Sequence, residues 1–126
     1  MYYHREDMIN HYIAGYNSFD PDKMVAHFDD NIIFENVQNG QVNITLSGIQ
    51  AFKDQAELTK NYFTSREQSI KSFKHSHNKT EVEIDYVAVL AMDFPNGLKE
   101  GELLTLKGKS IFEFKDNKII KLTDIS

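Results

Sequence analysis

Apolar residues near the start of the chain recur at helical spacing. Asp20-Pro21 predicts the end of this first helix and the start of a second, because aspartate suits an N-cap and proline the first helical position. Met24, Val25 and Phe28 would form the buried side of the second helix. The apolar stripe of the first helix consists of Met8, Ile9, Tyr12, Ile13, Tyr16 and Phe19.

The middle of the chain predicts a β-hairpin followed by a third helix. Residues 32–37 and 42–46 have strand patterns, and Asn39-Gly40 between them is a strong turn signal because both residues tolerate positive φ. Ser47-Gly48-Ile49-Gln50 resembles a capping box and predicts a helix from there to about Thr64. The apolar positions of that helix would be Ile49, Phe52, Ala56, Thr59 and Phe63.

After Ser65 the pattern changes to the alternation of an antiparallel sheet. The first clear strand, residues 81–93, has its apolar side chains at the even positions Val82, Ile84, Tyr86, Ala88, Leu90 and Met92. The next strand places Leu104, Leu106, Ser110, Phe112 and Phe114 on one face and lysines and glutamate on the other. The last strand follows a turn at Asp116-Asn117, and Ile120, Leu122 and Asp124 share one of its faces. We therefore predict an α+β fold of order ααββαββββ, with three helices on the concave face of a strongly bent, mainly antiparallel sheet.

Length, charge and composition exclude several classes of protein. The 126 residues fit a single domain, residues 1–126, and the net charge of −5 argues against nucleic-acid binding, which needs a concentrated basic patch. The absence of cysteine excludes disulfides, thiolate metal sites and a cysteine nucleophile. No apolar run approaches the length of a membrane span, and the N-terminus lacks the apolar core of a signal peptide. We expect a cytoplasmic protein.

Several segments resemble the nuclear-transport-factor-2-like superfamily, which includes ketosteroid isomerases and SnoaL-like polyketide cyclases. The resemblance is carried by residues 12–20, 28–36 and 110–120: a helix that ends in Asp20, the sequence Phe28-Asp29-Asp30 before an apolar strand, and a closing hairpin. It implies a cone-shaped sheet that encloses a pocket. In this superfamily one cone serves isomerases, dehydratases, cyclases, hydrolases and interaction modules, so the resemblance predicts the fold and leaves the function open.

The resemblance also implies roles for three residues. Tyr12 matches the tyrosine that hydrogen-bonds the substrate oxyanion in ketosteroid isomerases, Asn36 matches their proton-transferring aspartate, and Ser110 matches, across a gap of one residue, their protonated aspartic acid. A carboxamide cannot accept a proton near neutral pH, so ordinary ketosteroid isomerisation is not expected. Each residue also has a structural alternative. Tyr12 would be a core residue bonded to a backbone carbonyl, Asn36 would stabilise the following turn, and Ser110 would only pack in the interior.

Asp124 is the main candidate for acid–base chemistry. It shares a face with Ile120 and Leu122, and the resemblance places that face inside the cone. Burial in apolar surroundings raises the pKa of a carboxyl group, as a general acid or base near pH 7 requires. The alternative is a solvated carboxylate.

Aromatic and apolar side chains would line the pocket, namely Tyr16, Phe34, Tyr62, Phe63, Tyr86, Met92 and Phe112. Many would also belong to the core. His75 and His77 would share a strand face and could approach a metal, but no third ligand is evident, and we expect neither metal nor cofactor. The working hypothesis is a SnoaL-like protein that binds a small, mostly hydrophobic molecule with a polar head and transforms it by acid–base chemistry of the isomerase, cyclase or dehydratase type. The alternative is a non-catalytic ligand-binding or dimerisation module.

One departure from alternation predicts a homodimer. In the strand 81–93 the outward positions begin charged and then become Val87, Val89 and Ala91, with Leu103 and Ile111 on the neighbouring strand. An apolar patch on the convex face of a sheet favours contact with a second copy. The alternatives are a covering loop, or a bulge near Val87 that exchanges the faces.

Overall fold

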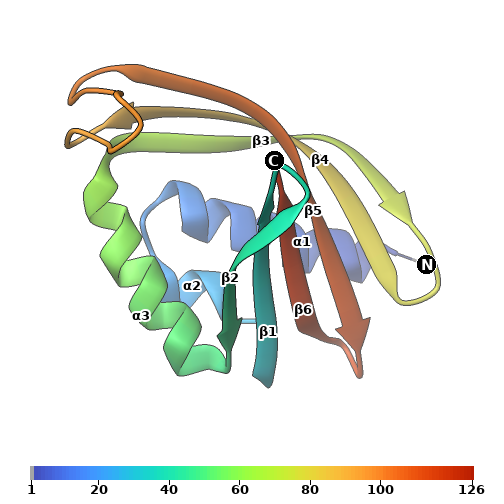
Figure 1. Cartoon of the computed structure of the whole chain (residues 1–126). Helices are drawn as coiled ribbons and strands as arrows, with labels where there is room; N and C mark the ends of the chain where they lie inside the picture. Colours follow the sequence, from blue (N-terminus) through green and yellow to red (C-terminus); the bar gives the residue numbers. More distant parts are fainter. Residues whose placement is uncertain (1) are drawn as a thin grey trace.

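A strongly bent six-stranded sheet wraps around three helices (Figure 1). The computed structural model describes residues 2–126. In chain order the elements are α1 (Tyr3–Asn17), α2 (Pro21–Met24), β1 (Phe28–Gln38), β2 (Gln41–Ser47), α3 (Ile49–Thr59), the 3-10 turn η1 (Lys60–Tyr62), β3 (Phe63–His75), β4 (Lys79–Leu90), β5 (Leu103–Lys115) and β6 (Lys118–Ile125). The predicted α+β class and the order of helices and strands are confirmed. Within residues 2–126, no helix combines the length and the apolar character needed to cross a membrane.

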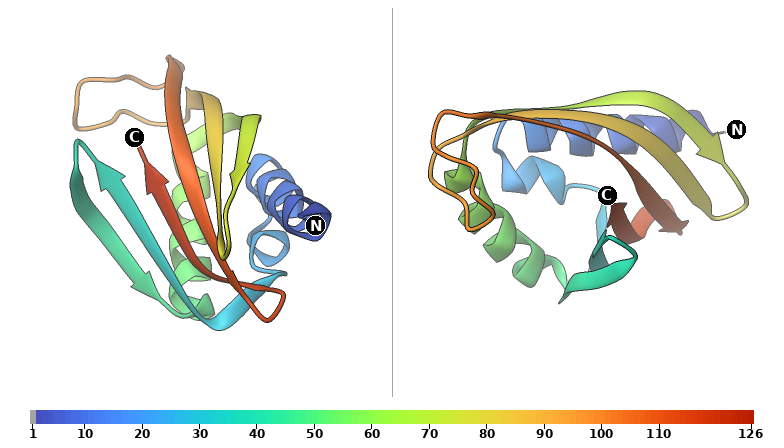
Figure 2. Two further views of the ribbon diagram at one scale, coloured as in Figure 1. Left: turned by 90° about the vertical axis from the view of Figure 1, so that its right-hand side faces the viewer. Right: turned by 45° about the horizontal axis from the view of Figure 1, so that its top comes forward.

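The strands follow the order β2-β1-β6-β5-β4-β3, and all neighbours are antiparallel except β1 and β6. The long strands β3, β4 and β5 arch over α1, while β6, β1 and β2 form the opposite wall (Figure 2). Pairing of β1 with β6 brings residue 36 beside residue 124, although they lie far apart in sequence. This pairing places the middle and the end of the chain against one interior.

The core forms where α1 meets the concave face of the sheet. Met8 and Ile9 of α1 are almost completely buried, as are Val82 of β4, Phe112 of β5 and Leu122 of β6. Glu83 and Lys109 point outward and are exposed. The predicted alternation therefore holds for the central part of the sheet.

Three inward positions of the predicted alternation are not part of the core. Leu104 is half-buried and Leu106 is 43% exposed, because they lie over an open part of the interior cavity where no helix covers them. Met92 is 44% exposed, because β4 ends at Leu90 and Met92 lies in the following turn. On β4 and β5 the alternation was correct, but it could not show where the helical layer ends.

On β6 the predicted alternation is wrong at its first residue. Ile119 is completely buried and the predicted inward residue Ile120 is not, because the register of β5 and β6 shifts there and leaves Ile120 unpaired.

The third helix differs from its prediction at both ends. It starts after Gly48, whose φ of 90° suits glycine, and no side chain caps it; Gln50 donates to Asp54 Oδ1 instead of closing a capping box. It ends at Thr59 rather than near Thr64, and Phe63 begins β3. The apolar spacing predicted a longer helix because Phe63, in the strand, also reaches the interior.

Two local signals were interpreted correctly. Asp20 caps α2 by accepting a hydrogen bond from the backbone N–H of Lys23 at 3.1 Å. Asn39 and Gly40 both adopt positive φ, of 54° and 78°, and join β1 to β2. The latter turn pairs Gln38 with Gln41, and a register shift between Val37 and Asn36 then pairs Asn36 with Ile44.

Candidate functional site

The interior of the cone contains two adjoining chambers. The inner chamber, of about 320 Å³, is lined by α1, α3, β1, β2 and β3 together with Asp124 of β6. The outer chamber, of about 710 Å³, opens between β5, the β1–β2 hairpin and the segment that connects β4 to β5. The two chambers share five of their lining residues, namely Tyr16, Asn36, Tyr62, Phe63 and Asp124. We therefore treat them as one continuous cavity.

Asp124 lies at the junction of the two chambers. Cross-strand pairing places it beside Asn36 on one side and Ser110 on the other. The Ser110 hydroxyl donates a hydrogen bond to Asp124 Oδ1 at 2.7 Å. Burial raises the pKa of Asp124 from its ordinary 3.8 to about 6, although the hydrogen bond from Ser110 acts in the opposite direction. This carboxyl group therefore titrates close to neutral pH.

Tyr12 projects from α1 into the inner chamber, and its residue is only 4% exposed. Its ring lies 5.8 Å from that of Phe28 and 5.6 Å from that of Phe112. Burial, and then the charge of Asp124, raise the pKa of the Tyr12 phenol well above its usual value. Tyr12 is therefore a neutral hydrogen-bond donor at any physiological pH.

Asn36 belongs to a polar strip on the β1–β2 hairpin. Its Nδ2 donates to Asn43 Oδ1 at 2.9 Å, and Asn43 Nδ2 donates in turn to Gln38 Oε1 at 3.2 Å. All three residues line the outer chamber. Asn36 therefore combines its two predicted roles, because it faces the cavity and also stabilises the hairpin.

Of the aromatic residues expected to line the cavity, Tyr16, Phe34, Tyr62, Phe63 and Tyr86 do so. The Tyr16 hydroxyl donates to the Tyr86 hydroxyl at 2.9 Å. Phe112 is fully buried and does not line either chamber; it lies behind Tyr12 and supports its ring. Met92 is also absent from the lining.

Sequence reasoning missed Arg66. This residue of β3 is only 5% exposed and lines the inner chamber. Its neighbours in β3 are mostly polar, so no apolar alternation marks its inward face. Only its pairing with the buried Ala88 of β4 fixes that face, and cross-strand register cannot be read from the sequence.

The two histidines considered for metal binding do not converge. His75 contacts Glu6 Oε2 at 2.6 Å through Nε2 and Thr80 Oγ1 at 2.9 Å through Nδ1. His77 lies beyond the end of β3 and is exposed. Both ring nitrogens of His75 already have protein partners, and these contacts join α1 to the β3–β4 hairpin.

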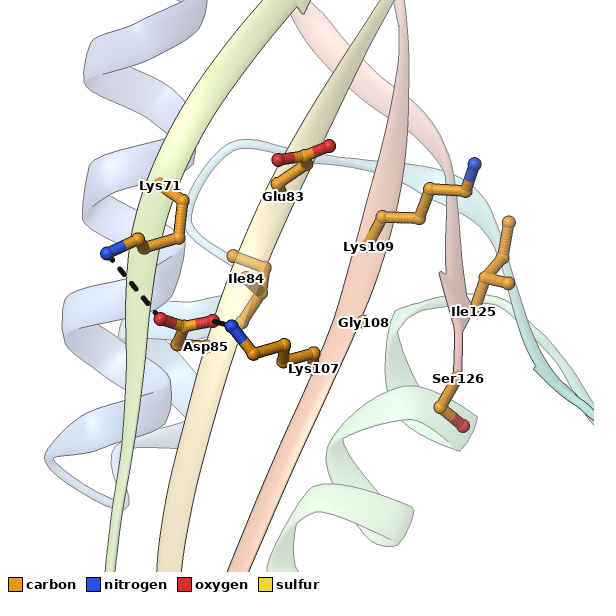
Figure 3. A pocket seen from close by; sticks show the side chains of 9 residues that line it. All are labelled: Lys71, Glu83, Ile84, Asp85, Lys107, Gly108, Lys109, Ile125 and Ser126. Atoms are coloured by element: carbon orange, nitrogen blue, oxygen red, sulfur yellow. Dashed lines mark ion pairs between the residues drawn. The ribbon is translucent and has the colours of Figure 1, made fainter.

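A further hollow, of about 480 Å³, lies against the outer side of β3, β4 and β5 (Figure 3). In it, Asp85 lies between Lys71 Nζ at 3.6 Å and Lys107 Nζ at 3.7 Å. These three charges are thus paired within the hollow, and Lys109 pairs with Glu81 beside it. The interior cavity, with a buried carboxyl group, is the better candidate site.

A bent sheet wrapped around three helices and an interior cavity is the cone fold of the nuclear-transport-factor-2-like proteins. The sequence pattern of the SnoaL-like domain family matches residues 9–122, and the chain belongs to this family. No curated protein sequence matches the chain.

Solved structures show the same fold at low sequence identity. A candidate polyketide cyclase of Xanthomonas campestris pv. campestris is 17% identical, with a TM-score of 0.81 over 98% of this chain and 90% of that one. A candidate SnoaL-like polyketide cyclase of Jannaschia is 10% identical, with a TM-score of 0.79 over 96% and 83%. A protein of Catenulispora acidiphila with a ketosteroid-isomerase-like fold, solved in complex with trimethylamine, is 11% identical, with a TM-score of 0.76 over 94% and 83%. These likenesses establish the fold.

Proposed function

We propose that this protein binds a small, mostly hydrophobic molecule with a polar head in its interior cavity and transfers a proton on it, with Asp124 as the acid–base group. The observation that carries the proposal is the position of Asp124: a carboxyl group that lines both chambers and whose pKa is raised to about 6 by burial. A group that titrates near the working pH can both accept and return a proton efficiently.

The surrounding residues have complementary roles in this proposal. The Tyr12 hydroxyl would donate to the substrate oxygen on which negative charge develops, since its raised pKa keeps it protonated. Asn36, next to Asp124 across the β1–β6 pairing, would hold a polar group of the substrate. Ser110 already donates to Asp124, so it would orient the carboxylate rather than contact the substrate.

The chemistry is proton transfer at a carbon next to a carbonyl group. Asp124 would take a proton from that carbon, and the electron pair of the C–H bond would move toward the carbonyl oxygen, which Tyr12 would stabilise. In a substrate with a C=C bond next to that carbon, the enolate is a dienolate, and return of the proton from Asp124 to the far end of the C=C bond would complete an isomerisation. The related outcomes are loss of a hydroxyl group as water and attack of the enolate on a second carbonyl group.

A non-catalytic ligand-binding or dimerisation module is the alternative function. Asn36 favours it, because an amide stands where the resemblance to ketosteroid isomerases implies the catalytic aspartate, and its Nδ2 is engaged with Asn43. The two functions differ in the role of Asp124, because in a non-catalytic module this residue would take part in no reaction.

The first test measures, by proton NMR, how fast the α-protons of 1-tetralone exchange for deuterium in D₂O. The same measurement is made on any molecule that mass spectrometry finds retained through purification. We expect the wild-type protein to accelerate the exchange, with a rate that rises as the pH increases through about 6. Asp124→Asn should lower the rate about 100-fold or more, and Tyr12→Phe about 100-fold.

Asp85→Asn is the matched control, because this carboxylate lies on the outer face of the sheet and should leave the rate unchanged. Equal rates for the wild type and Asp124→Asn, with tetralone or with a retained molecule, would contradict the catalytic proposal and favour the non-catalytic module.

A further inference from the structure

Arg66 is a buried cation without an anionic partner. Its residue is 5% exposed, and burial of an unpaired charge is costly enough that buried arginines are normally paired with carboxylates. Among residues 2–126, no carboxylate lies within ion-pair distance of Arg66. The protein therefore maintains a positive charge at the wall of the inner chamber.

The guanidinium group is held rigidly. Its central carbon lies 3.8 Å from the centre of the Tyr16 ring and 4.5 Å from that of Phe19, and Nε donates to the Tyr16 backbone carbonyl at 2.9 Å. This last bond has a structural role of its own, because it satisfies a carbonyl at the end of α1. It does not use the terminal nitrogens, which donate to no described residue; they are not among the fully buried atoms without a partner, so they remain accessible to a ligand.

The free edge of the group matches the geometry of a carboxylate. Two terminal N–H groups of arginine form a planar fork that binds two carboxylate oxygens together. Aromatic stacking keeps the plane of the fork fixed, so little rotamer entropy remains to be lost when an anion binds.

Arg66, Tyr12 and Asp124 all line the inner chamber. No ion pair joins Arg66 and Asp124, and both act on Tyr12: the charge of Asp124 raises the pKa of its phenol, whereas Arg66 lowers it. One chamber therefore offers a cation, a phenol and a carboxyl group to a single ligand.

We propose that Arg66 is the anion-recognition site of the cavity and that the ligand is an apolar carboxylic acid. Its carboxylate would pair with the terminal nitrogens of Arg66, its apolar body would lie against Tyr12 and Phe34, and its reacting carbon would reach Asp124. The inference rests on the proposed function in assuming that the cavity is the ligand site. It adds the charge and the orientation of the ligand.

The test uses the fluorescence of N-phenyl-1-naphthylamine, a neutral probe of apolar cavities, and its displacement by two competitors at pH 8. The competitors, 2-naphthoate and 2-naphthamide, share a ring system and differ in the carboxylate. We expect naphthoate to displace the probe at a concentration about tenfold lower than naphthamide, or lower still. Arg66→Gln should remove this preference and leave the affinity for naphthamide within about twofold. Arg66→Lys, which keeps the charge but loses the fork, should retain part of the preference.

Lys74→Gln is the matched control, because it removes one positive charge from the same strand at an exposed position. It should leave the preference for naphthoate unchanged.

Two results would contradict the anion site and leave the proposed ligand cavity intact. The first is that the wild-type protein binds both competitors equally, and the second is that Arg66→Gln retains the full preference for naphthoate. If Arg66→Gln does not fold, Arg66→Lys decides, and an unchanged preference in that variant overturns the carboxylate fork. Failure of the wild type to bind the naphthylamine and both competitors would contradict the ligand cavity itself, and the anion site with it.

Discussion

The properties of Asp124 arise from two opposing effects on one carboxyl group. Burial favours its protonated form, and the hydrogen bond from Ser110 favours its ionised form; burial prevails, so the pKa rises to about 6. A buried carboxylate without a cationic partner lowers the stability of the folded state at neutral pH. In the proposed function, the ionised form of Asp124 that accepts a proton is thus also the form that lowers stability.

The first prediction concerns the pH dependence of stability. Because the folded protein holds the Asp124 proton more tightly than the unfolded chain does, the group costs nothing below about pH 4. Its cost grows as the pH rises toward about 6 and stays constant above that. A pKa shift from 3.8 to about 6 corresponds to about 3 kcal/mol. Urea denaturation should therefore show Asp124→Asn to be more stable than the wild type at pH 7.5 and of similar stability at pH 4. An equal difference at both pH values would show that Asp124 titrates normally in the folded protein.

The sequence predicted which residues line the cavity better than it predicted which side chains contact one another. Tyr12, Asn36 and Asp124 line one cavity, as the resemblance and the alternation of β6 had implied. The bond between Ser110 and Asp124 depends on the register of β5 and β6, and the buried position of Arg66 depends on the register of β3 and β4. Register is fixed by side-chain packing across strands, which a single sequence does not reveal.

At the scale of elements, α1 and α2 pack closely against each other at Gly15. Gly15 of α1 lies so near α2 that an added Cβ would be 2.8 Å from the backbone nitrogen of Met24 and 3.1 Å from the carbonyl carbon of Lys23. Backbone atoms cannot move aside as a flexible side chain can. This contact lies next to Tyr16, and so it also positions one wall of the cavity.

We predict that Gly15→Ala destabilises the protein. Alanine favours a helix over glycine by about 1 kcal/mol, but overpacking against backbone costs about 1–3 kcal/mol. The net loss should be up to about 2 kcal/mol, measured as a lower free energy of unfolding in urea. Asn10→Ala, at an exposed position of the same helix, should be neutral or slightly stabilising. A Gly15→Ala protein more stable than the wild type would show that the two helices can separate at little cost.

At the scale of the whole molecule, the bent sheet buries its concave face and leaves apolar residues on its convex face. Val87 is 42% exposed and Leu103 is 63% exposed, and Leu103 pairs directly with Val89 across β4 and β5. Ala91, just beyond β4, is half-buried. The faces of β4 are not exchanged near Val87, because Ala88 and Leu90 remain buried. The patch expected from the sequence is present on the outer surface of the sheet.

We predict that this patch, formed by Val87, Val89 and Leu103, is the interface of a homodimer. Sedimentation equilibrium at micromolar concentration should give twice the chain mass of 14.6 kDa. Val89→Glu should yield the monomer, because it would bury a charge at the interface. Val42→Glu, on β2 outside the patch, where the Val42 residue is 52% exposed, should leave the dimer intact. A monomeric wild type, or a dimer that tolerates Val89→Glu, would contradict this interface.

The paired hydroxyl groups of Tyr16 and Tyr86, together with Tyr12, also give the protein an intrinsic optical signal. Burial raises the pKa of all three phenols, so they should ionise at a higher pH than exposed tyrosines do. Tyrosinate absorbs at a longer wavelength than tyrosine. A ligand that fills the cavity would bury these phenols further, and it should therefore move the late part of an alkaline absorbance titration to still higher pH without any label.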